Sequence, residues 1–282
     1  MLAIVVLGSV IHALLGRSQV SATLSASTGH REAVVRDRAA AWLAAQVSRG
    51  TGMTCDAAMC AALRARGIPD ADLSELRPGG RPVLPAATAG TSPVAVLVAT
   101  RAVRGQLGSA LGSTYAPVVI AVFGSGPDRV EVRAMAGPGA AAFAAMARAD
   151  LIQRRDSGAE LLQTGRIVVS GPAARAELAR GEVDARLLVM IANLASRQPL
   201  DVLAFGDRAP GARLTDSPLR SVELAPAGPR AAGAAFARAA LAFLKTQTGS
   251  FATASAGAAR LPGGQLGVRF AFAAPSPLGL LG

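Results

Sequence analysis

The chain is nearly devoid of the residues used for histidine- or lysine-based chemistry. Its two histidines, His12 and His30, precede residue 31, and Lys245 is the one lysine in 282 residues. A Ser-His-Asp or Cys-His arrangement therefore finds no base beyond residue 30. The sequence also contains neither G-x-x-x-x-G-K-[S/T] nor G-x-G-x-x-G, the two common phosphate-binding loops. These absences identify no reaction, and we expect no cofactor.

Cysteine is scarce as well: Cys55 and Cys60, in CDAAMC, are the only two. Two thiols without a nearby histidine cannot complete a four-ligand zinc site, and their spacing is not C-x-x-C, so we expect no metal. If Asp56 caps a following helix, the cysteines occupy the two positions that a hydrophobic staple brings together. We predict a Cys55–Cys60 disulfide, which implies an oxidising compartment. Two reduced, buried thiols are the alternative.

Aromatic residues make up only 4% of the chain, whereas hydrophobic residues make up 51% and charged residues 17%. This composition is typical of a folded protein whose core consists of Ala, Val and Leu. The net charge of +11 favours anionic partners such as acidic lipid, wall polymer or nucleic acid. Nucleic acid is disfavoured, because arginine pairs such as Arg154/Arg155 have the spacing of a solvated helix face and lack interleaved aromatics.

The long apolar run lies at the N-terminus, where residues 1–15 (MLAIVVLGSVIHALL) carry no charged side chain. A helix of this length spans roughly 22 Å, which is shorter than the bilayer hydrocarbon of about 30 Å. A signal peptide has basic residues before its apolar region, and this run has none before it. We expect residues 1–16 to form a membrane anchor and the Ser/Thr-rich residues 17–35 a stalk, with the folded part extracytoplasmic. A buried helix of a soluble domain is the alternative.

Buried strands alternate with helices along the rest of the chain. Val94–Ala99 and Val118–Phe123 are continuous apolar runs, and Arg129–Met135 alternates like an edge strand. This order predicts an α/β fold of two consecutive modules, residues 36–137 and 138–282, with mostly parallel sheets and antiparallel edge strands. The second module ends in a helix and a β-hairpin.

The two modules share a short pattern. Each has an apolar strand ending in Phe-Gly, at Phe123-Gly124 and Phe205-Gly206, followed by a strand with Val-Glu, at Val130-Glu131 and Val222-Glu223. The pattern suggests related units, although it is too short to establish a duplication.

A ligand site is expected at the carboxyl ends of parallel strands, where α/β sheets usually bind. In the first module these ends carry Asp56, Thr100, Arg101, Gly124 and Ser125. Arg101 has the donor geometry to hold a carboxylate or a phosphate. The alternative is that Asp56 only caps its helix and that Arg101 is solvated.

Residues 36–135 resemble the extracytoplasmic C-terminal module of membrane glycosyltransferases of the protein-mannosyltransferase type in high-GC bacteria. The stretches that carry the resemblance are Arg38–Gly50, Cys55–Gly67, Val94–Thr100 and Tyr115–Arg133. The many membrane spans and acidic catalytic loops of those transferases are missing here, so the resemblance implies a framework and not an activity. From Pro138 onward the chain resembles uncharacterised single-anchor envelope proteins.

Together these features indicate a membrane-anchored, non-enzymatic envelope protein that binds a ligand or an unidentified protein partner. The alternatives are an envelope carbohydrate-active enzyme or accessory domain that uses carboxylates, and a cytoplasmic nucleic-acid-binding protein.

The location is testable by fractionation. We predict that the protein stays with membranes after a high-salt wash, because residues 1–16 are held by the hydrophobic effect and not by charge. Protease added to intact spheroplasts should degrade the folded part. Protection from that protease would reverse the orientation and remove the argument for an oxidising compartment.

Overall fold

The computed structural model describes residues 29–83, 95–135, 137, 139–206, 217–228 and 232–274. The expected anchor, residues 1–16, lies outside these ranges, and within them no helix is long and apolar enough to cross a membrane. Residues 29–35, which we expected in the stalk, are instead helical and belong to a helix over residues 29–46. The helix includes them because Val35 packs against Gly124 of the folded module.

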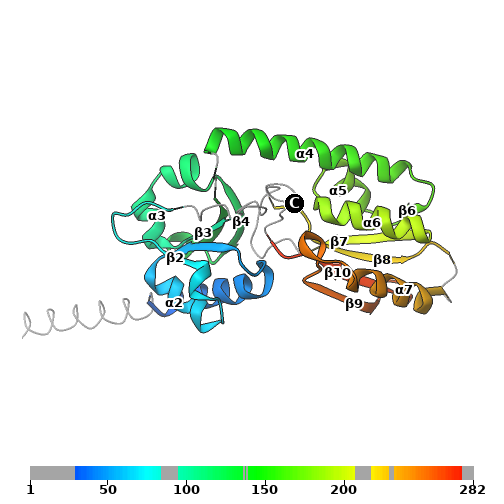
Figure 1. Ribbon diagram of the computed structural model, residues 1–282, viewed down its shortest axis with the longest axis horizontal. Coiled ribbons are helices and arrows are strands. Elements are labelled where there is room, and N and C mark those ends of the chain that lie inside the picture. Colours follow the sequence, from blue (N-terminus) through cyan, green and yellow to red (C-terminus); the bar gives the residue numbers. More distant parts are fainter. Residues whose placement is uncertain are drawn as a thin grey trace, which may run out of the picture.

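The first module contains a five-stranded sheet in the order β2-β1-β3-β5-β4 (Figure 1). β1 pairs in parallel with β2 and β3, whereas β5 is antiparallel to both β3 and β4. The strands are β1 (Gly52–Cys55), β2 (Leu73–Glu75), β3 (Ala95–Ala99), β4 (Val118–Phe123) and β5 (Val130–Ala134).

Helices cover both faces of this sheet. β3 is buried on both sides: Val96 and Val98 face the core beneath the helix over residues 29–46 and α2 (Ala57–Ala65), while Leu97 faces the core beneath α3 (Arg101–Leu107). A π-helical turn (Leu111–Tyr115) and short 3-10 turns at Asp70–Asp72 and Gly126–Asp128 complete the module. The continuous apolar run of β3 is what such two-sided burial requires.

The expectation that Arg129–Met135 forms an edge strand is wrong. β5 lies between β3 and β4, and the edge strands of this sheet are β2 and β4. The polar side chains tolerate this position because they pair: Glu131 of β5, 7% exposed, forms ion pairs of 2.6 Å with Arg133 of the same strand and with Arg129, the residue before it. Alternation of polar and apolar residues here reflects ion pairs around a buried glutamate and not a strand at the edge of the sheet.

The second module contains a sheet in the order β6-β7-β8-β10-β9. Only β6 and β7 pair in parallel, so the expectation of mostly parallel sheets is also wrong. Short loops join β4 to β5 and β9 to β10. A short loop between two neighbouring strands imposes antiparallel pairing. The strands are β6 (Ile167–Val169), β7 (Leu200–Gly206), β8 (Ser221–Pro226), β9 (Ser255–Arg260) and β10 (Leu266–Ala271).

Three helices cover one face of the second sheet. α5 (Ala174–Arg180), α6 (Ala185–Arg197) and α7 (Gly233–Lys245) share a core with the inward residues of β7, β8 and β10. The opposite face carries Val168, which is 49% exposed, and the ion pair of Arg269 with Glu223. A short 3-10 turn at Gly249–Phe251 follows α7.

The shared Phe-Gly and Val-Glu pattern marks two equivalent strand pairs. Phe123 pairs with Val130 in β4–β5, and Phe205 pairs with Val222 in β7–β8. The register also shifts shortly before the phenylalanine in both pairs, between Val119 and Ala121 in β4 and between Val202 and Ala204 in β7. Beyond these pairs the two sheets differ in strand order, so the equivalence is local.

A helix, a β-bridge and a cation–π contact join the modules. α4 (Ala140–Gln163) runs over both of them (Figure 1), with Phe143 in the core of the first and Leu161 in the core of the second. Elsewhere, Ala274 at the end of the second module forms a β-bridge with Val47 of the first. The guanidinium of Arg220 lies 5.7 Å from the ring centroid of Trp42, which also packs against Phe123.

α4 extends beyond the residue at which we expected it to end, about Asp156. It continues through Gly158 because α5 approaches it there: a Cβ on Gly158 would lie 2.5 Å from the carbonyl oxygen of Leu178. The glycine is thus required by close packing of two helices and does not terminate the first of them.

We predict that Gly158→Ala lowers the free energy of unfolding by about 1–3 kcal/mol, because the added methyl group meets backbone and cannot be accommodated by a rotamer change. Gly105→Ala in α3 is the matched control, since nothing lies within 4 Å of its Cβ position. It should leave stability unchanged or raise it by up to about 1 kcal/mol. Equal effects of the two substitutions in chemical denaturation would contradict the close contact.

Candidate functional site

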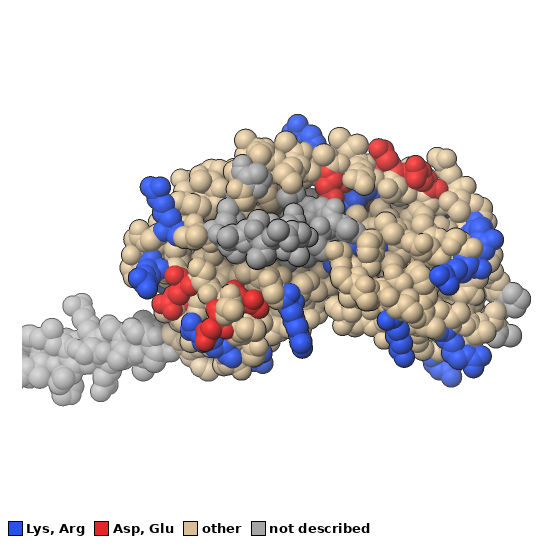
Figure 2. Space-filling model, viewed as in Figure 1, with Lys and Arg blue, Asp and Glu red and all other residues tan. Residues whose placement is uncertain are grey.

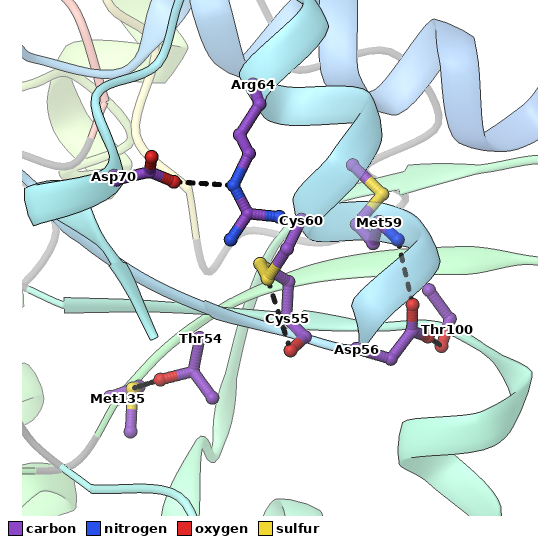
Figure 3. Close-up of a disulfide and its surroundings, with 9 residues drawn as sticks. All are labelled: Thr54, Cys55, Asp56, Met59, Cys60, Arg64, Asp70, Thr100 and Met135. Carbon is purple, nitrogen blue, oxygen red and sulfur yellow. Dashed lines mark hydrogen bonds and ion pairs between the residues drawn. A yellow bond between two sulfur atoms is a disulfide. The ribbon is translucent and has the colours of Figure 1, made fainter. Parts of the chain in front are cut away.

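The predicted disulfide is confirmed: Cys55 and Cys60 are joined, with their Cα atoms 5.5 Å apart (Figure 3). Cys55 ends β1, Asp56 is the N-cap of α2, and Cys60 lies in the first turn of that helix. Both cysteines are fully buried. The bond therefore fixes the direction in which the chain passes from strand to helix at the carboxyl edge of the first sheet.

Asp56 links two helix N-termini at this edge. Its Oδ1 accepts a hydrogen bond of 2.8 Å from the backbone N–H of Met59, and its Oδ2 accepts one from the hydroxyl of Thr100 (Figure 3). Thr100 is in turn the N-cap of α3, where its Oγ1 accepts from the N–H of Val103. The structure thus brings Asp56 and Thr100 together, and both carboxylate oxygens already have donors within the fold.

The other predicted site residues lie on the same edge but apart from this pair. Arg101 is exposed, without a hydrogen-bond or ion-pair partner among the described residues. Gly124 and Ser125 follow β4, which β5 separates from β3 by two strand spacings, about 10 Å. They line an open groove of about 600 Å³ with His30 and Asp128. The predicted residues therefore form no single pocket.

Arg104, whose spacing from Arg101 is that of a solvated helix face, instead binds backbone carbonyls at this edge. Its guanidinium donates to the carbonyl oxygens of Ala99, at 2.9 Å, of Pro127, at 2.6 Å, and of Arg129. Burial lowers the pKa of Arg104, and the nearby charge of Arg129 acts in the same direction. The side chain fastens the loop after β4 to the end of β3, so its role at this edge is structural.

A more enclosed site lies between the two modules, beneath α4. This inter-module cavity has a volume of about 480 Å³. Its wall is largely apolar, and arginines surround it; the lining residues are Pro117, Val118, Phe143, Ala144, Ala147, Arg148, Leu151, Arg154, Arg155, Arg180, Gly181 and Glu182. Binding sites commonly occupy such concave junctions between modules.

Two arginines of α4 bind the C-terminal end of α5, which forms part of the cavity wall. Arg154, 4% exposed, forms an ion pair of 2.9 Å with Asp150 and donates to the carbonyl oxygen of Gly181. Arg155 Nε donates to the carbonyl oxygen of Arg180 at 3.1 Å. These carbonyls belong to the last residue of α5 and to its C-cap, where the helix dipole favours a positive charge. The cavity wall is thereby fixed.

Unneutralised positive charge remains at the rim of the cavity. Arg148 is exposed and has no hydrogen-bond or ion-pair partner among the described residues, and the Nη atoms of Arg155 have none there either. Glu182 is the one carboxylate in the lining, and it is held by both oxygens to Arg180, at 2.8 and 3.2 Å. Burial raises the pKa of nearby Asp150, although the charge and hydrogen bond of Arg154 act in the opposite direction.

The first module supplies the opposite wall. Arg133 donates to the carbonyl oxygens of Ala116, at 2.6 Å, and of Pro117, at 3.2 Å, which fixes the segment leading into β4. Burial acts to raise the pKa of Glu131, but the hydrogen bonds and charges of Arg129 and Arg133 outweigh it and hold that pKa below its usual range. Glu131 therefore stays ionised and keeps Arg133 in place.

The inter-module cavity was not predicted, because Arg154 and Arg155 were interpreted as part of a solvated face. A usable signal was present. Ala144, Ala147, Leu151 and Arg154 recur at three- and four-residue intervals and so lie on one face of α4. An arginine on an otherwise apolar helical stripe is a candidate for a buried or interfacial position.

No protein-family model, curated protein or solved structure matches this chain. Within the described ranges, no group of three or more His, Cys, Asp or Glu side chains could hold a metal ion.

We predict that Cys60→Ala lowers the free energy of unfolding by about 2 kcal/mol, because it opens the ring of six residues in the unfolded chain. The double variant Cys55→Ala/Cys60→Ala should lose a similar amount, since the cross-link is already absent in the single variant. Non-reduced peptide mapping should recover the two cysteines in one cross-linked peptide. Two freely alkylated thiols in protein from its native compartment would contradict the disulfide.

Proposed function

We propose that this chain is a membrane-anchored, extracytoplasmic binding protein whose ligand is an anionic amphiphile held in the inter-module cavity. The observation that carries the proposal is the combination, in one cavity, of an apolar wall from the first module and α4 with two rim arginines, Arg148 and Arg155, that have no ion-pair partner among the described residues. A ligand with an apolar body and a carboxylate, phosphate or sulfate group matches both parts.

We assign separate roles to the apolar and the basic residues that line the cavity. Phe143, Val118 and Leu151 would contact the apolar body, and burial of that surface would contribute most of the affinity. Arg148 and Arg155 would bind the acidic group through charge-assisted hydrogen bonds and so fix the orientation of the ligand. Because the wall is set by packing and by the contacts of Arg154, the site needs little rearrangement to bind.

The envelope location is supported by two independent features. The disulfide at Cys55–Cys60 is typical of proteins that fold in an oxidising compartment. The uncharged residues 1–15 are suited to hold the chain at a membrane. An enzyme with paired carboxylates fits the cavity less well, because Glu182 is the one carboxylate among its lining residues and it is bound to Arg180.

The proposal can be tested with anilinonaphthalene sulfonate, a fluorescent probe that combines an aromatic body with one sulfonate group. Wild-type protein should bind it, and Arg148→Ala should weaken binding about tenfold, by loss of a charge-assisted hydrogen bond. Leu151→Glu should abolish binding, since it places a negative charge on the apolar wall. Titration of the probe fluorescence gives the dissociation constants.

Ile152→Glu is the matched control for Leu151→Glu. Ile152 is the next residue of α4, is 52% exposed and does not line the cavity. It should bind the probe as the wild type does, with an unchanged circular dichroism spectrum in each variant. Equal affinity of all the variants would show that the probe binds elsewhere and would refute the site.

A further inference from the structure

The C-terminal part of the chain carries charge of one sign. All 18 acidic residues precede residue 224, so residues 224–282 contain basic residues without a single Asp or Glu. The basic residues of this stretch are Arg230, Arg238, Lys245, Arg260 and Arg269. They supply +5 of the net charge of +11, although the stretch is about a fifth of the chain.

Three of these residues are exposed on the helix-covered side of the second module. Arg238 and Lys245 lie seven residues apart in α7 and therefore on the same side of the helix, away from its buried Phe236 and Leu244. Arg260 pairs with Leu266 in the β9–β10 ladder, which places it on the sheet face that α7 covers. Arg197, at the end of α6, joins them with its guanidinium 4.5 Å from the ring centroid of Phe243.

We call this the α7 surface, defined by Arg197, Arg238, Lys245 and Arg260. Figure 2 shows blue side chains without red ones over α7 and β9 at the lower right, whereas red groups accompany the blue ones on the first module. Apart from Arg197, which stacks on Phe243, its members have no hydrogen-bond or ion-pair partner among the described residues. By contrast, Arg269 on the other sheet face is paired with Glu223.

The α7 surface suits a bilayer better than a nucleic acid. Between Arg238 and Lys245 the exposed residues of α7 are alanines, and single-stranded nucleic acid is usually bound through exposed aromatic platforms. A flat anionic surface needs only unpaired cations that can approach it together. Each Lys or Arg near an anionic membrane surface contributes about 1 kcal/mol, so several acting together are enough to orient a tethered protein.

We propose that the α7 surface binds anionic lipid headgroups and lays the second module against the membrane. This surface is distinct from the inter-module cavity and does not require a ligand there. It adds a second, electrostatic contact to the apolar segment at residues 1–15.

The test uses the full chain and preformed vesicles of phosphatidylcholine, alone or mixed with phosphatidylglycerol. Ala242→Cys, on the exposed side of α7, carries a fluorophore that is quenched by a nitroxide attached to lipid headgroups; the native cysteines are joined and buried and should not react. Ala145→Cys, exposed on α4, carries the same fluorophore as a control position. Quenching at position 242 should require phosphatidylglycerol, exceed that at position 145 and weaken as salt is raised.

Charge reversal separates the α7 surface from net charge. Arg238→Glu/Lys245→Glu should weaken the phosphatidylglycerol-dependent association at least about thirtyfold, as expected for two lost cations. Arg49→Glu/Arg66→Glu changes the net charge equally on exposed residues of the first module and should have little effect. Equal losses in the two double variants, or quenching at position 242 that persists in Arg238→Glu/Lys245→Glu, would overturn the proposal.

Two further outcomes are informative. Association with neutral vesicles reports on residues 1–15 and therefore on the proposed anchor, whereas the difference between anionic and neutral vesicles reports on the α7 surface. If a single-stranded oligonucleotide binds in a manner that depends on Arg238 and Lys245, and anionic vesicles do not, the surface is a nucleic-acid interface and the membrane proposal is wrong.

Discussion

The arrangement of the two modules depends on a single continuous helix. Phe143 and Leu161 belong to different cores, yet both lie on α4, where eighteen residues correspond to about 27 Å. A helix with intact hydrogen bonds does not bend freely, so the separation of the cores is set by helix geometry and not by a linker. The inter-module cavity is the space that this separation leaves beneath α4, which is why its lining comes from α4 and from both modules.

Much of the arginine in this chain serves the fold and is not free to bind partners. Arg154 and Arg186 are almost fully buried, and each combines an ion pair with a hydrogen bond to a backbone carbonyl. Arg104 binds only carbonyls. The planar guanidinium can do this because it offers several donors in fixed directions and never loses its charge, whereas lysine offers one flexible ammonium group. Net charge alone therefore overstates how basic the surface is, and the exposed cations that remain unpaired matter more.

Local structure could be predicted from the sequence far better than strand order or the site. Asp56 predicted the start of a helix because N-capping is a local interaction. The Cys55–Cys60 disulfide was predicted from the same capping geometry. The position of β5 inside its sheet depends on which strands meet, and nothing within Val130–Ala134 records that. The cavity could not be predicted for a related reason. The sequence does not show whether an arginine faces water or, as Arg154 does, a carbonyl oxygen such as that of Gly181.

The bridge between Val47 and Ala274 has a consequence for biosynthesis. Ala274 is a buried member of the core of the first module, and its backbone N–H donates to the carbonyl oxygen of Gln46 at 2.6 Å. A ribosome makes Val47 long before Ala274, so the first module emerges with part of its core still unsynthesised. It cannot reach its final packing until the second module has been translated. A chain truncated before Ala274 would therefore lack a core residue of the N-terminal module, although the change is made at the far end of the sequence.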